Sequence, residues 1–441
     1  MPEEVVIIGA GAAGLTAAIN LAKAGFRVNI LEARDRIGGR MFTKIDPVTK
    51  AAIELGAEFV HGTPREIWDL IRVHRFETTE MDGDDWCVRN QQLNPCDFFS
   101  EVEQILGRMN DREPDQSFAD FLKRCCPEAS QEAKEWTLGY VQGFHAADPE
   151  LVGVHALVKG TRADDAIEGN RAFRIHGGYQ TLLEVWQKQA TEFGVSIRLN
   201  TVVESIAWKQ GHAELAARSE VGALNLTAKR VLITLPLGVL QAGTVRFAPP
   251  LPLEKLRAIG YLEMGKVIRV TLCFRERFWE NLRPPNSKSS QTLSNLAFLL
   301  SRDEWFPTWW TQQSQDLPIL VGWAPFPSAQ RLSGRTEGYI VEKALETLAR
   351  LLGLDQKEIS SRLQSAHLHD WQTDPFSRGA YSYVKVGGGN AEHDLGLSVE
   401  NTLFFAGEAT DVTGHNGTVH GAIASGRRAA REVVEGTGSL S

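Results

Sequence analysis

The alternation of hydrophobic and polar positions at the start of the chain predicts a β-strand, an α-helix and a second strand. The apolar run Val5–Ile8 is short and ends at a glycine, which is typical of a buried strand. A helical period follows over Leu15–Ala24 and closes at Gly25, and Val28–Leu31 is a second apolar run. We therefore expect the chain to open with a βαβ unit.

The rest of the chain predicts a mixture of helices and strands. Residues 82–147 have charged helical periods with few β-branched residues, so we expect a helical part there. A polar loop with two adjacent prolines is expected at 283–294. The other expected strands are 195–199, 229–235, 264–274 and 403–406, and the other expected helices are 339–352 and 419–434.

Length and composition limit the class of protein. The chain has 441 residues, which favours two domains over one core. A formal net charge of −8 argues against nucleic acid or an anionic membrane as the main partner. No apolar run reaches the ~18 residues of a membrane span, and the first residues lack the pattern of a signal peptide. We expect a cytoplasmic protein.

The cysteines predict neither a disulfide framework nor a metal site. Their number is odd, and no two have the Cys-x-x-Cys spacing. We expect reduced thiols, as in the cytosol, and no bound metal. The five are Cys87, Cys96, Cys125, Cys126 and Cys273.

A glycine motif between the first strand and helix predicts a dinucleotide site. In this G-x-G-x-x-G, Gly9 permits the tight turn, Gly11 lets the backbone approach a pyrophosphate, and Gly14 allows close packing of helix and strand. The start of the helix favours the pyrophosphate charge. Glu32, at the end of the second strand, is placed to accept hydrogen bonds from a ribose. A glycine-rich turn without a ligand is the alternative.

The segment after Glu32 favours FAD over NAD. Residues 36–40, Arg-Ile-Gly-Gly-Arg, resemble the second dinucleotide motif of FAD enzymes. The paired glycines admit the pyrophosphate, and Arg40 supplies a fixed positive charge. The alternative is an exposed basic turn.

Further segments resemble the flavin-containing amine oxidases, which include monoamine oxidases, polyamine oxidases and lysine-specific histone demethylases. The resemblance covers nearly the whole chain and is weakest over residues 63–171. The segments that resemble the family are 54–62, 177–179, 202–203, 231–236, 371, 379–383, 405–408 and 417–422.

The resemblance implies a fold of α/β and α+β class with two domains. A discontinuous Rossmann-type FAD-binding domain is expected from residues 1–76, 174–246 and 368–441. A substrate domain with a mixed sheet and a helical subdomain is expected from residues 77–173 and 247–367.

The glycine motif and the resemblance together imply a set of cofactor contacts. The helix that begins near Thr418 directs its N-terminus at the negative charge of reduced flavin. Monoamine oxidases attach FAD through a cysteine at the position of Ala380, so we expect non-covalent FAD here. The expected contacts are Gly9, Gly11, Ala13, Gly14, Glu32, Ala33, Arg34, Gly39, Arg40, Gly56, Ala57, Glu58, Phe59, Val203, Trp371, Gly407, Glu408, Thr418 and Val419.

Aromatic residues are suited to amine chemistry. An amine must lose a proton before its α-carbon gives up hydride, and a desolvated site lowers the amine pKa while aromatic faces attract the entering cation. The resemblance implies that Tyr381 is one aromatic wall, with Thr418 opposite. His61 matches a substrate-contacting position of polyamine oxidases and is expected to titrate near neutrality, or to be a structural hydrogen-bonder. Four aromatic residues at 305–310 line an entrance or pack in the core.

One position departs from the family. The resemblance implies a lysine on a long strand, where it holds a water beside flavin N5, and alignment on Phe274 and Trp279 puts Arg269 there. Lys266 is three residues earlier and points to the other face of a regular strand. We expect Arg269 at the flavin; the alternative is a slipped register with Arg269 in solvent.

We expect an FAD-dependent amine oxidase that transfers hydride from the amine α-carbon to flavin, gives an imine and then an aldehyde, and uses O2 to form H2O2. The expected partners are a monoamine or polyamine and O2, without nucleic acid or membrane, and a homo-oligomer is compatible with the sequence. One alternative is an L-amino acid oxidase or another flavin oxidoreductase of this fold, which needs an arginine for the substrate carboxylate, with Arg162, Arg171 and Arg174 available. A flavin-bearing chromatin module is the other.

Overall fold

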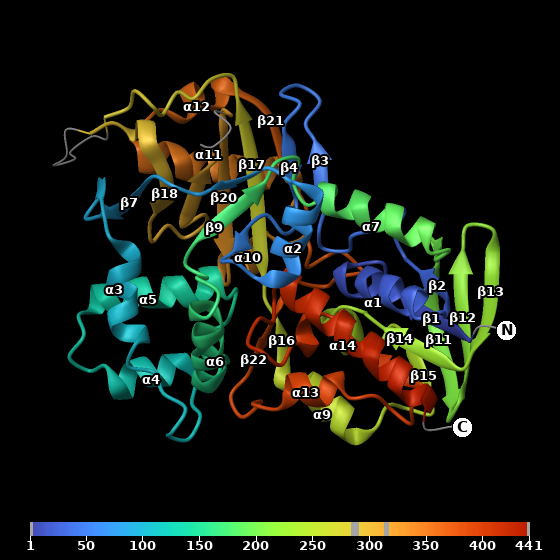
Figure 1. Ribbon diagram of the computed structural model, residues 1–441. Coiled ribbons are helices and arrows are strands. Elements are labelled where there is room, and N and C mark those ends of the chain that lie inside the picture. Colours follow the sequence, from blue (N-terminus) through green and yellow to red (C-terminus); the bar gives the residue numbers. More distant parts are fainter. Residues whose placement is uncertain (1–2, 284–290, 313–316, 439–441) are drawn as a thin grey trace.

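A five-stranded parallel sheet forms the centre of one half of the molecule in the computed structural model, which describes residues 3–283, 291–312 and 317–438 (Figure 1). The strand order is β10-β2-β1-β14-β23. The strands are mostly short apolar runs, as expected when helices or a second sheet cover both faces. Their bounds are β1 (Glu4–Ile8), β2 (Arg27–Leu31), β10 (Ser196–Arg198), β14 (Arg230–Ile233) and β23 (Leu403–Phe405).

Alternate residues of β1 face two different apolar clusters, because successive side chains of a strand point to opposite faces. Val5 and Ile7 pack with helices α1 (Ala12–Lys23), α7 (Gln180–Glu192) and α14 (Val419–Gly438). The residues between them, Val6 and Ile8, pack with a second sheet of order β13-β12-β11-β15. That sheet consists of β11 (Val202–Lys209), β12 (His212–Ser219), β13 (Gly222–Ala228) and β15 (Arg246–Ala248).

A seven-stranded mixed sheet builds the other half, with the order β21-β17-β20-β19-β18-β7-β8. All residues of β17 are buried, and α11 (Glu337–Leu352) packs with it in one apolar cluster. In Figure 1, α11 and α12 lie beside this sheet at the upper left. The bounds are β7 (Asp84–Arg89), β8 (Gln92–Pro95), β17 (Val267–Phe274), β18 (Leu296–Leu300), β19 (Thr308–Thr311), β20 (Ile319–Pro325), β21 (Leu363–Leu368), α10 (Ser328–Leu332) and α12 (Gln356–Arg362).

Four helices group beside the mixed sheet, at the lower left of Figure 1. Side chains at the N-caps Asp97, Ser117 and Ser130 accept hydrogen bonds from backbone N–H groups of α3, α4 and α5, which fixes where these helices begin. The four are α3 (Phe98–Leu106), α4 (Phe118–Cys125), α5 (Gln131–Phe144) and α6 (Val154–Asp165).

Shorter elements connect the two halves. The three-stranded sheet β5-β9-β6 and the pairs β3-β4 and β16-β22 lie between the larger sheets. Their bounds are β3 (Thr43–Ile45), β4 (Ala52–Glu54), β5 (Val60–His61), β6 (Thr78–Glu80), β9 (Ala172–Ile175), β16 (Leu262–Met264) and β22 (Ser382–Val384). The remaining helices are α2 (Arg65–His74), α8 (Leu237–Gln241), α9 (Leu253–Tyr261) and α13 (Ala391–Gly396), with 3-10 turns at Leu293–Asn295 and Glu408–Thr410.

The expected fold class and βαβ opening are confirmed, with two corrections. The helical prediction for residues 82–147 is wrong at its start, where β7 and β8 form a hairpin around Asn90 and Gln91, both with positive φ. The expected strand 264–274 is two strands, separated at Gly265 and Lys266. Gly265 instead bonds the backbone of Ala380 and Tyr381. Most of the polar loop expected at 283–294 lies outside the described residues.

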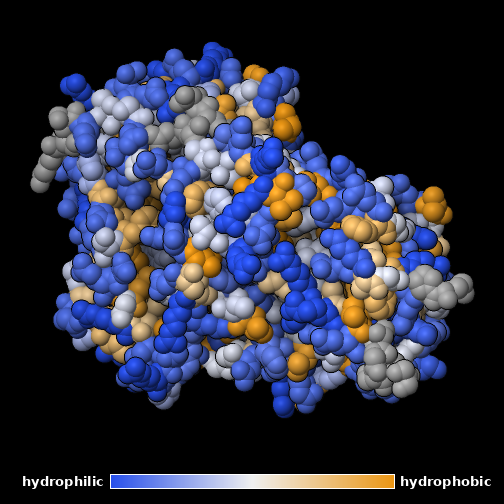
Figure 2. Space-filling view, viewed as in Figure 1, coloured by the Kyte–Doolittle hydropathy of each residue, from blue (hydrophilic) through white to orange (hydrophobic). Residues whose placement is uncertain are grey.

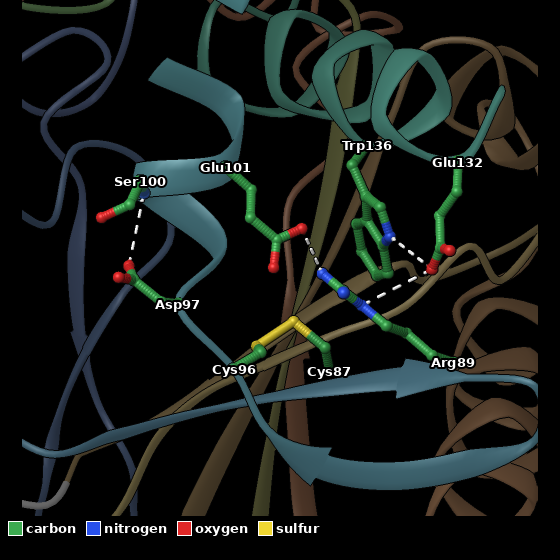
Figure 3. The surroundings of a disulfide bond; sticks show 8 residues. All are labelled: Cys87, Arg89, Cys96, Asp97, Ser100, Glu101, Glu132 and Trp136. Atoms are coloured by element: carbon green, nitrogen blue, oxygen red, sulfur yellow. Dashed lines mark hydrogen bonds and ion pairs between the residues drawn. A yellow bond between two sulfur atoms is a disulfide. The ribbon is translucent and has the colours of Figure 1, made fainter. Parts of the chain in front are cut away.

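The expectation of reduced thiols is wrong for two of the five cysteines. Cys87 and Cys96 form a disulfide that closes the β7–β8 hairpin, with their Cα atoms 5.7 Å apart (Figure 3). Hairpin pairing brings the two strands together, and spacing along the sequence does not reveal it. The bond lies beside Arg89, which pairs with Glu101 of α3 and Glu132 of α5. The disulfide thus closes the hairpin, and Arg89 ties the hairpin to helices α3 and α5.

We expect a Cys87→Ala, Cys96→Ala double variant to be less stable than the parent chain by about 2–3 kcal/mol, because the parent's unfolded chain is constrained by a loop of about ten residues. Chemical denaturation without reductant measures the difference. Cys125→Ala, which removes an exposed free cysteine, is the matched control. Thiol titration of denatured, unreduced parent protein should find the three free cysteines; five reactive thiols would contradict the disulfide.

Candidate active site

The glycine motif forms a tight turn with open space at its centre. A Cβ at Gly14 would overlap the carbonyl oxygen of Gly9, so α1 packs against β1 only with glycine there. A Cβ at Gly11, the N-cap of α1, would meet no protein atom within 4 Å. No side chain caps this helix start, and the first N–H groups of a helix have no partner within it. The turn therefore offers room and free donors to an anion such as a pyrophosphate.

Glu32 and Arg34 are fixed by the protein itself. The buried Glu32 carboxylate accepts hydrogen bonds from the N–H of Ala10 at 2.7 Å and of Arg34 at 2.9 Å. Burial raises the pKa of Glu32 above its usual value. The Arg34 guanidinium binds both oxygens of Asp374 at 2.9 and 2.7 Å. The Glu32 carboxylate is thus held next to the glycine turn, whereas Arg34 forms an ion pair with Asp374.

Arg40 and Glu408 connect three segments that are distant in sequence. Arg40 Nη1 donates to Glu408 Oε1 and to the carbonyl of Ala380, both at 2.8 Å. Glu408 Oε2 accepts from Ser382 Oγ at 2.6 Å and from the N–H of Gly417 at 2.8 Å. Because protein donors occupy the Glu408 carboxylate, its part is to hold Arg40 and the loop before α14. Arg40, Gly407 and Glu408 line a pocket together with Thr234.

The segment around Gly56 lies against this cluster. A Cβ at Gly56 would overlap the carbonyl oxygen of Arg40 and would lie 3.2 Å from the ring of Trp371. Trp371 Nε1 donates to the carbonyl of Leu55 at 2.8 Å. Gly56, Ala57 and Phe59 are partly exposed, whereas Glu58 between them is buried. The side chain of Glu58 therefore points away from the surface that its neighbours form.

Tyr381 lies at the start of α14. Its ring would be 3.1 Å from a Cβ at Gly417, and its hydroxyl donates to the carbonyl of Phe144 at 2.9 Å. Thr418 Oγ1 accepts from the N–H of Gly421 at 3.0 Å, which leaves the first N–H groups of the helix, from Val419 on, for another acceptor. An aromatic ring and a helix N-terminus therefore meet at one place.

His61 belongs to a chain of aromatic rings. Its ring centre is 5.9 Å from that of Phe59 and 5.3 Å from that of Phe144, and Phe144 stacks on Tyr140 at 5.3 Å. Although His61 is partly exposed, burial lowers its pKa to about 4. The expected titration of His61 near neutrality is therefore wrong, because the apolar surroundings disfavour the imidazolium. Burial also raises the pKa of Tyr381.

Arg269 is buried and contacts the Gly56 segment. Its Nη1 donates to the carbonyl of Gly56 at 3.0 Å and to Glu58 Oε2 at 3.2 Å. The alternative in which Arg269 faces solvent is thus excluded. Burial lowers the pKa of Arg269, and the carboxylates of Glu58 and Glu54 oppose this shift. Lys266 is partly buried at the break before β17, outside the strand that holds Arg269.

Glu58 has two further donors that the sequence did not indicate. Arg174 Nε donates to Glu58 Oε1 at 2.8 Å, and Trp310 Nε1 lies 3.3 Å from both carboxylate oxygens. The Arg174 guanidinium also lies over the Phe59 ring, 4.8 Å from its centre. Strand pairing explains this position: Val60 of β5 lies opposite Phe173 of β9, so the next residues, Phe59 and Arg174, are also neighbours. The sequence alone does not show which strands pair.

Most of the expected site residues lie close together in the structure, and a few lie elsewhere. Ala13 is in the first turn of α1, and Val203 on β11 is buried in the neighbouring apolar cluster. Of the two alternatives for the aromatic residues at 305–310, core packing is confirmed for Phe306 and Trp309, which are fully buried, and Trp310 bonds Glu58. Phe144, which contacts both His61 and Tyr381, was not expected; it lies in the segment that least resembles the family.

One cluster outside this site has side chains that are able to bind a metal. Ligand atoms of Asp46, Cys273 and His367 lie within 4.8 Å of one another. The Asp46 carboxylate already accepts from Thr49, Ser365 and His367, and this bonding lowers its pKa. The hydrogen bonds account for the cluster without an ion, and the expectation of no metal stays a prediction.

Together, the glycine turn and the helix N-termini are typical of a dinucleotide-binding protein. The sequence model of one protein family, the flavin containing amine oxidoreductases, matches residues 12–434 of this chain. The chain belongs to this family, which confirms the expected kind of oxidoreductase and the expected FAD cofactor.

Relatives in this family include oxidases and demethylases. Probable polyamine oxidase 4 of Arabidopsis thaliana is 28% identical over 96% of this chain and 85% of its own length. Lysine-specific histone demethylase 1 homolog 1 of Oryza sativa subsp. japonica is 30% identical over 98% of this chain and 52% of its own length. The chain spans 30% and 59% of two Arabidopsis demethylase homologs.

A solved structure shows the same fold. Wild-type putrescine oxidase bound to putrescine superposes with a TM-score of 0.80 at 20% identity, over 99% of each chain. At this identity the likeness shows the fold alone. In the described part of the chain, no helix is long and apolar enough to cross a membrane, and the visible face in Figure 2 is mostly hydrophilic.

We expect Gly11→Ala to fold normally but to bind FAD at least about tenfold more weakly, because its added methyl group would enter the space that a pyrophosphate needs. Thermal unfolding of flavin-free protein and FAD titration separate the two effects. Gly139→Ala on α5 is the control, since a Cβ there also meets no atom within 4 Å. Full FAD affinity in Gly11→Ala would contradict this site.

Proposed function

We propose that this chain is an FAD-dependent oxidase of primary or secondary amines. The observation that carries the proposal is the contact of Tyr381 with Gly417 directly before α14, at the end of the Arg40–Glu408 cluster. When bound, FAD supplies a two-electron acceptor that takes hydride from the amine α-carbon, leaves an imine for hydrolysis to an aldehyde, and is reoxidised by O2 with release of H2O2.

The chain's own residues prepare the amine for this step. The ring of Tyr381, whose hydroxyl binds the Phe144 carbonyl, and the Phe59 and Phe144 rings on either side of His61 offer apolar faces. These faces attract a cation during entry and disfavour it once water is excluded. His61 is neutral at physiological pH because its pKa is about 4. A neutral imidazole adds no repulsion and accepts a hydrogen bond from the amine nitrogen.

The alternative of an L-amino acid oxidase needs a cation for the substrate carboxylate. Arg162 pairs with Asp111, and Arg171 with Glu80 and Glu168, all near the surface. Arg174 binds the buried Glu58. Each of the three arginines thus already has a carboxylate in the fold, which supports an amine without a required α-carboxylate. The names of the polyamine and putrescine oxidases among the similar proteins support a small aliphatic amine.

Several expectations remain proposals. The FAD-binding domain consists of residues 1–76, 174–246 and 368–441, and the substrate domain of the rest. FAD is held without a covalent bond, since Ala380 offers no nucleophile. Homo-oligomer formation and a cytoplasmic location stay predictions. The location rested in part on reduced cysteines, and the Cys87–Cys96 disulfide removes that part of its support.

Arg269 occupies the position of the family lysine in this proposal. Its hydrogen bond to the carbonyl of Gly56 supports a place beside the flavin, because Gly56 also contacts Arg40 and Trp371. A guanidinium holds a water or stabilises a negative charge but does not relay a proton at any relevant pH.

We expect amine turnover at saturating substrate concentration to rise with pH, by about tenfold per unit below the pKa of the bound amine, since only the neutral form gives up hydride. His61, already neutral, should add no step near neutrality. Peroxide release from a panel of monoamines, polyamines and amino acids checks this. Tyr381→Ala should lower amine turnover about tenfold while FAD content is retained. A strict requirement for an α-carboxylate would establish the amino acid oxidase instead.

We expect Arg269→Met to slow the reaction of the reduced enzyme with oxygen by about a hundredfold, because a fixed positive charge is lost. Stopped-flow absorbance of the flavin measures the rate. Lys266→Met is the matched control and should react almost as fast as the parent enzyme. The reverse pattern would show that Lys266, and not Arg269, serves the flavin.

A further inference from the structure

Three buried charges meet behind the segment that contacts the flavin in the proposed function. Arg174 and Arg269 both bind the Glu58 carboxylate, one on each oxygen. The side chains of Arg174 and Arg269 are each 7% exposed and that of Glu58 is 4% exposed. Solvent therefore screens these charges little, and their sum acts on whatever lies nearby.

The cluster contains more positive than negative charge. Two guanidinium groups face one carboxylate, and guanidinium groups remain charged even when buried. Among the described residues, Nη2 of Arg174 and Nη2 of Arg269 have no hydrogen-bond partner. A single carboxylate thus leaves part of each guanidinium without an acceptor.

The charge of Glu54 also acts on Arg269, without a hydrogen bond between the two side chains among the described residues. Burial raises the pKa of Glu54 to about 7. Its carboxylate accepts hydrogen bonds from the Thr43 hydroxyl and from the N–H of Tyr179, which partly oppose this shift. Near neutral pH, Glu54 is therefore only partly ionised and offsets only part of the excess charge.

We propose that Arg174 acts as a positioning and charge-balancing residue: it engages Glu58 so that Arg269 keeps a net positive charge toward the flavin. Without Arg174, Glu58 pairs with Arg269 alone, and the pair is neutral. The inference rests on the proposed function, because it needs Arg269 beside the flavin. Its consequence is that the site stabilises negative charge on the flavin and on small anions that bind to it.

The sign of two charge changes tests this inference. Arg174→Gln should weaken binding of sulfite to the oxidised flavin by about tenfold, lower the flavin reduction potential and slow reoxidation, since one positive charge is lost. Glu58→Gln should change all three in the opposite direction. A purely structural cluster predicts that both variants impair the site alike.

Matched variants separate charge from packing. Arg174→Lys, which keeps the charge, should restore most of the sulfite affinity. Arg171→Gln, three residues earlier and exposed with Glu80 and Glu168, should leave it unchanged. If Glu58→Gln does not fold, the comparison of Arg174→Gln with Arg174→Lys still decides.

Three results would each overturn a different part of the proposal. An unchanged sulfite affinity in Arg174→Gln, with a large loss in Arg269→Met, would reject the role of Arg174 and keep Arg269 at the flavin. No effect in Arg269→Met would instead reject the proposed place of Arg269. Equal losses in Arg174→Gln and Arg174→Lys would show that shape, and not charge, matters.

Discussion

The ion pair between Arg40 and Glu408 is the interaction on which the site depends. The two residues are 368 positions apart, and their side chains meet at 2.8 Å with Glu408 almost fully buried. Through the same two groups pass hydrogen bonds to Ala380, Ser382 and Gly417. Breaking a buried pair leaves an uncompensated charge, which is strongly destabilising. The pair therefore fixes the segment that ends at Arg40 against the loop that precedes α14.

The geometry of the aromatic wall follows from this pair. Ser382 is bound to Glu408, so the preceding Tyr381 is held over Gly417. The Tyr381 hydroxyl in turn binds Phe144 at the end of α5, which links the wall to the helical group. Because each group is held by a neighbour, little reorganisation is required when a ligand enters, and preorganised sites of this kind stabilise developing charge most effectively.

Local pattern was sufficient to predict the elements that fold from adjacent residues. The βαβ opening with Gly9, Gly11 and Gly14 is one continuous segment, and its alternation and glycines decide its structure. The β7–β8 hairpin was missed because β7 owes its place to pairing with β18, some 200 residues away. The partner of Glu58 was missed for the same reason, since Arg174 is 116 residues distant. The residues that determine the charge of the site are brought together by long-range contacts, and the periodicity of the sequence does not predict such contacts.

The charges around the site also bear on the choice of substrate. A polycation that entered beside Arg269 would meet a cluster with excess positive charge and little solvent screening, which costs free energy unless carboxylates elsewhere compensate. His61 contributes no charge of either sign, because burial lowers its pKa to about 4. In the proposed function, recognition of the reacting nitrogen therefore depends on the apolar rings, on desolvation and on a hydrogen bond to the neutral His61, and not on a charged side chain. If a substrate of the proposed function carries a second amino group, electrostatic repulsion favours a position for that group away from Arg269.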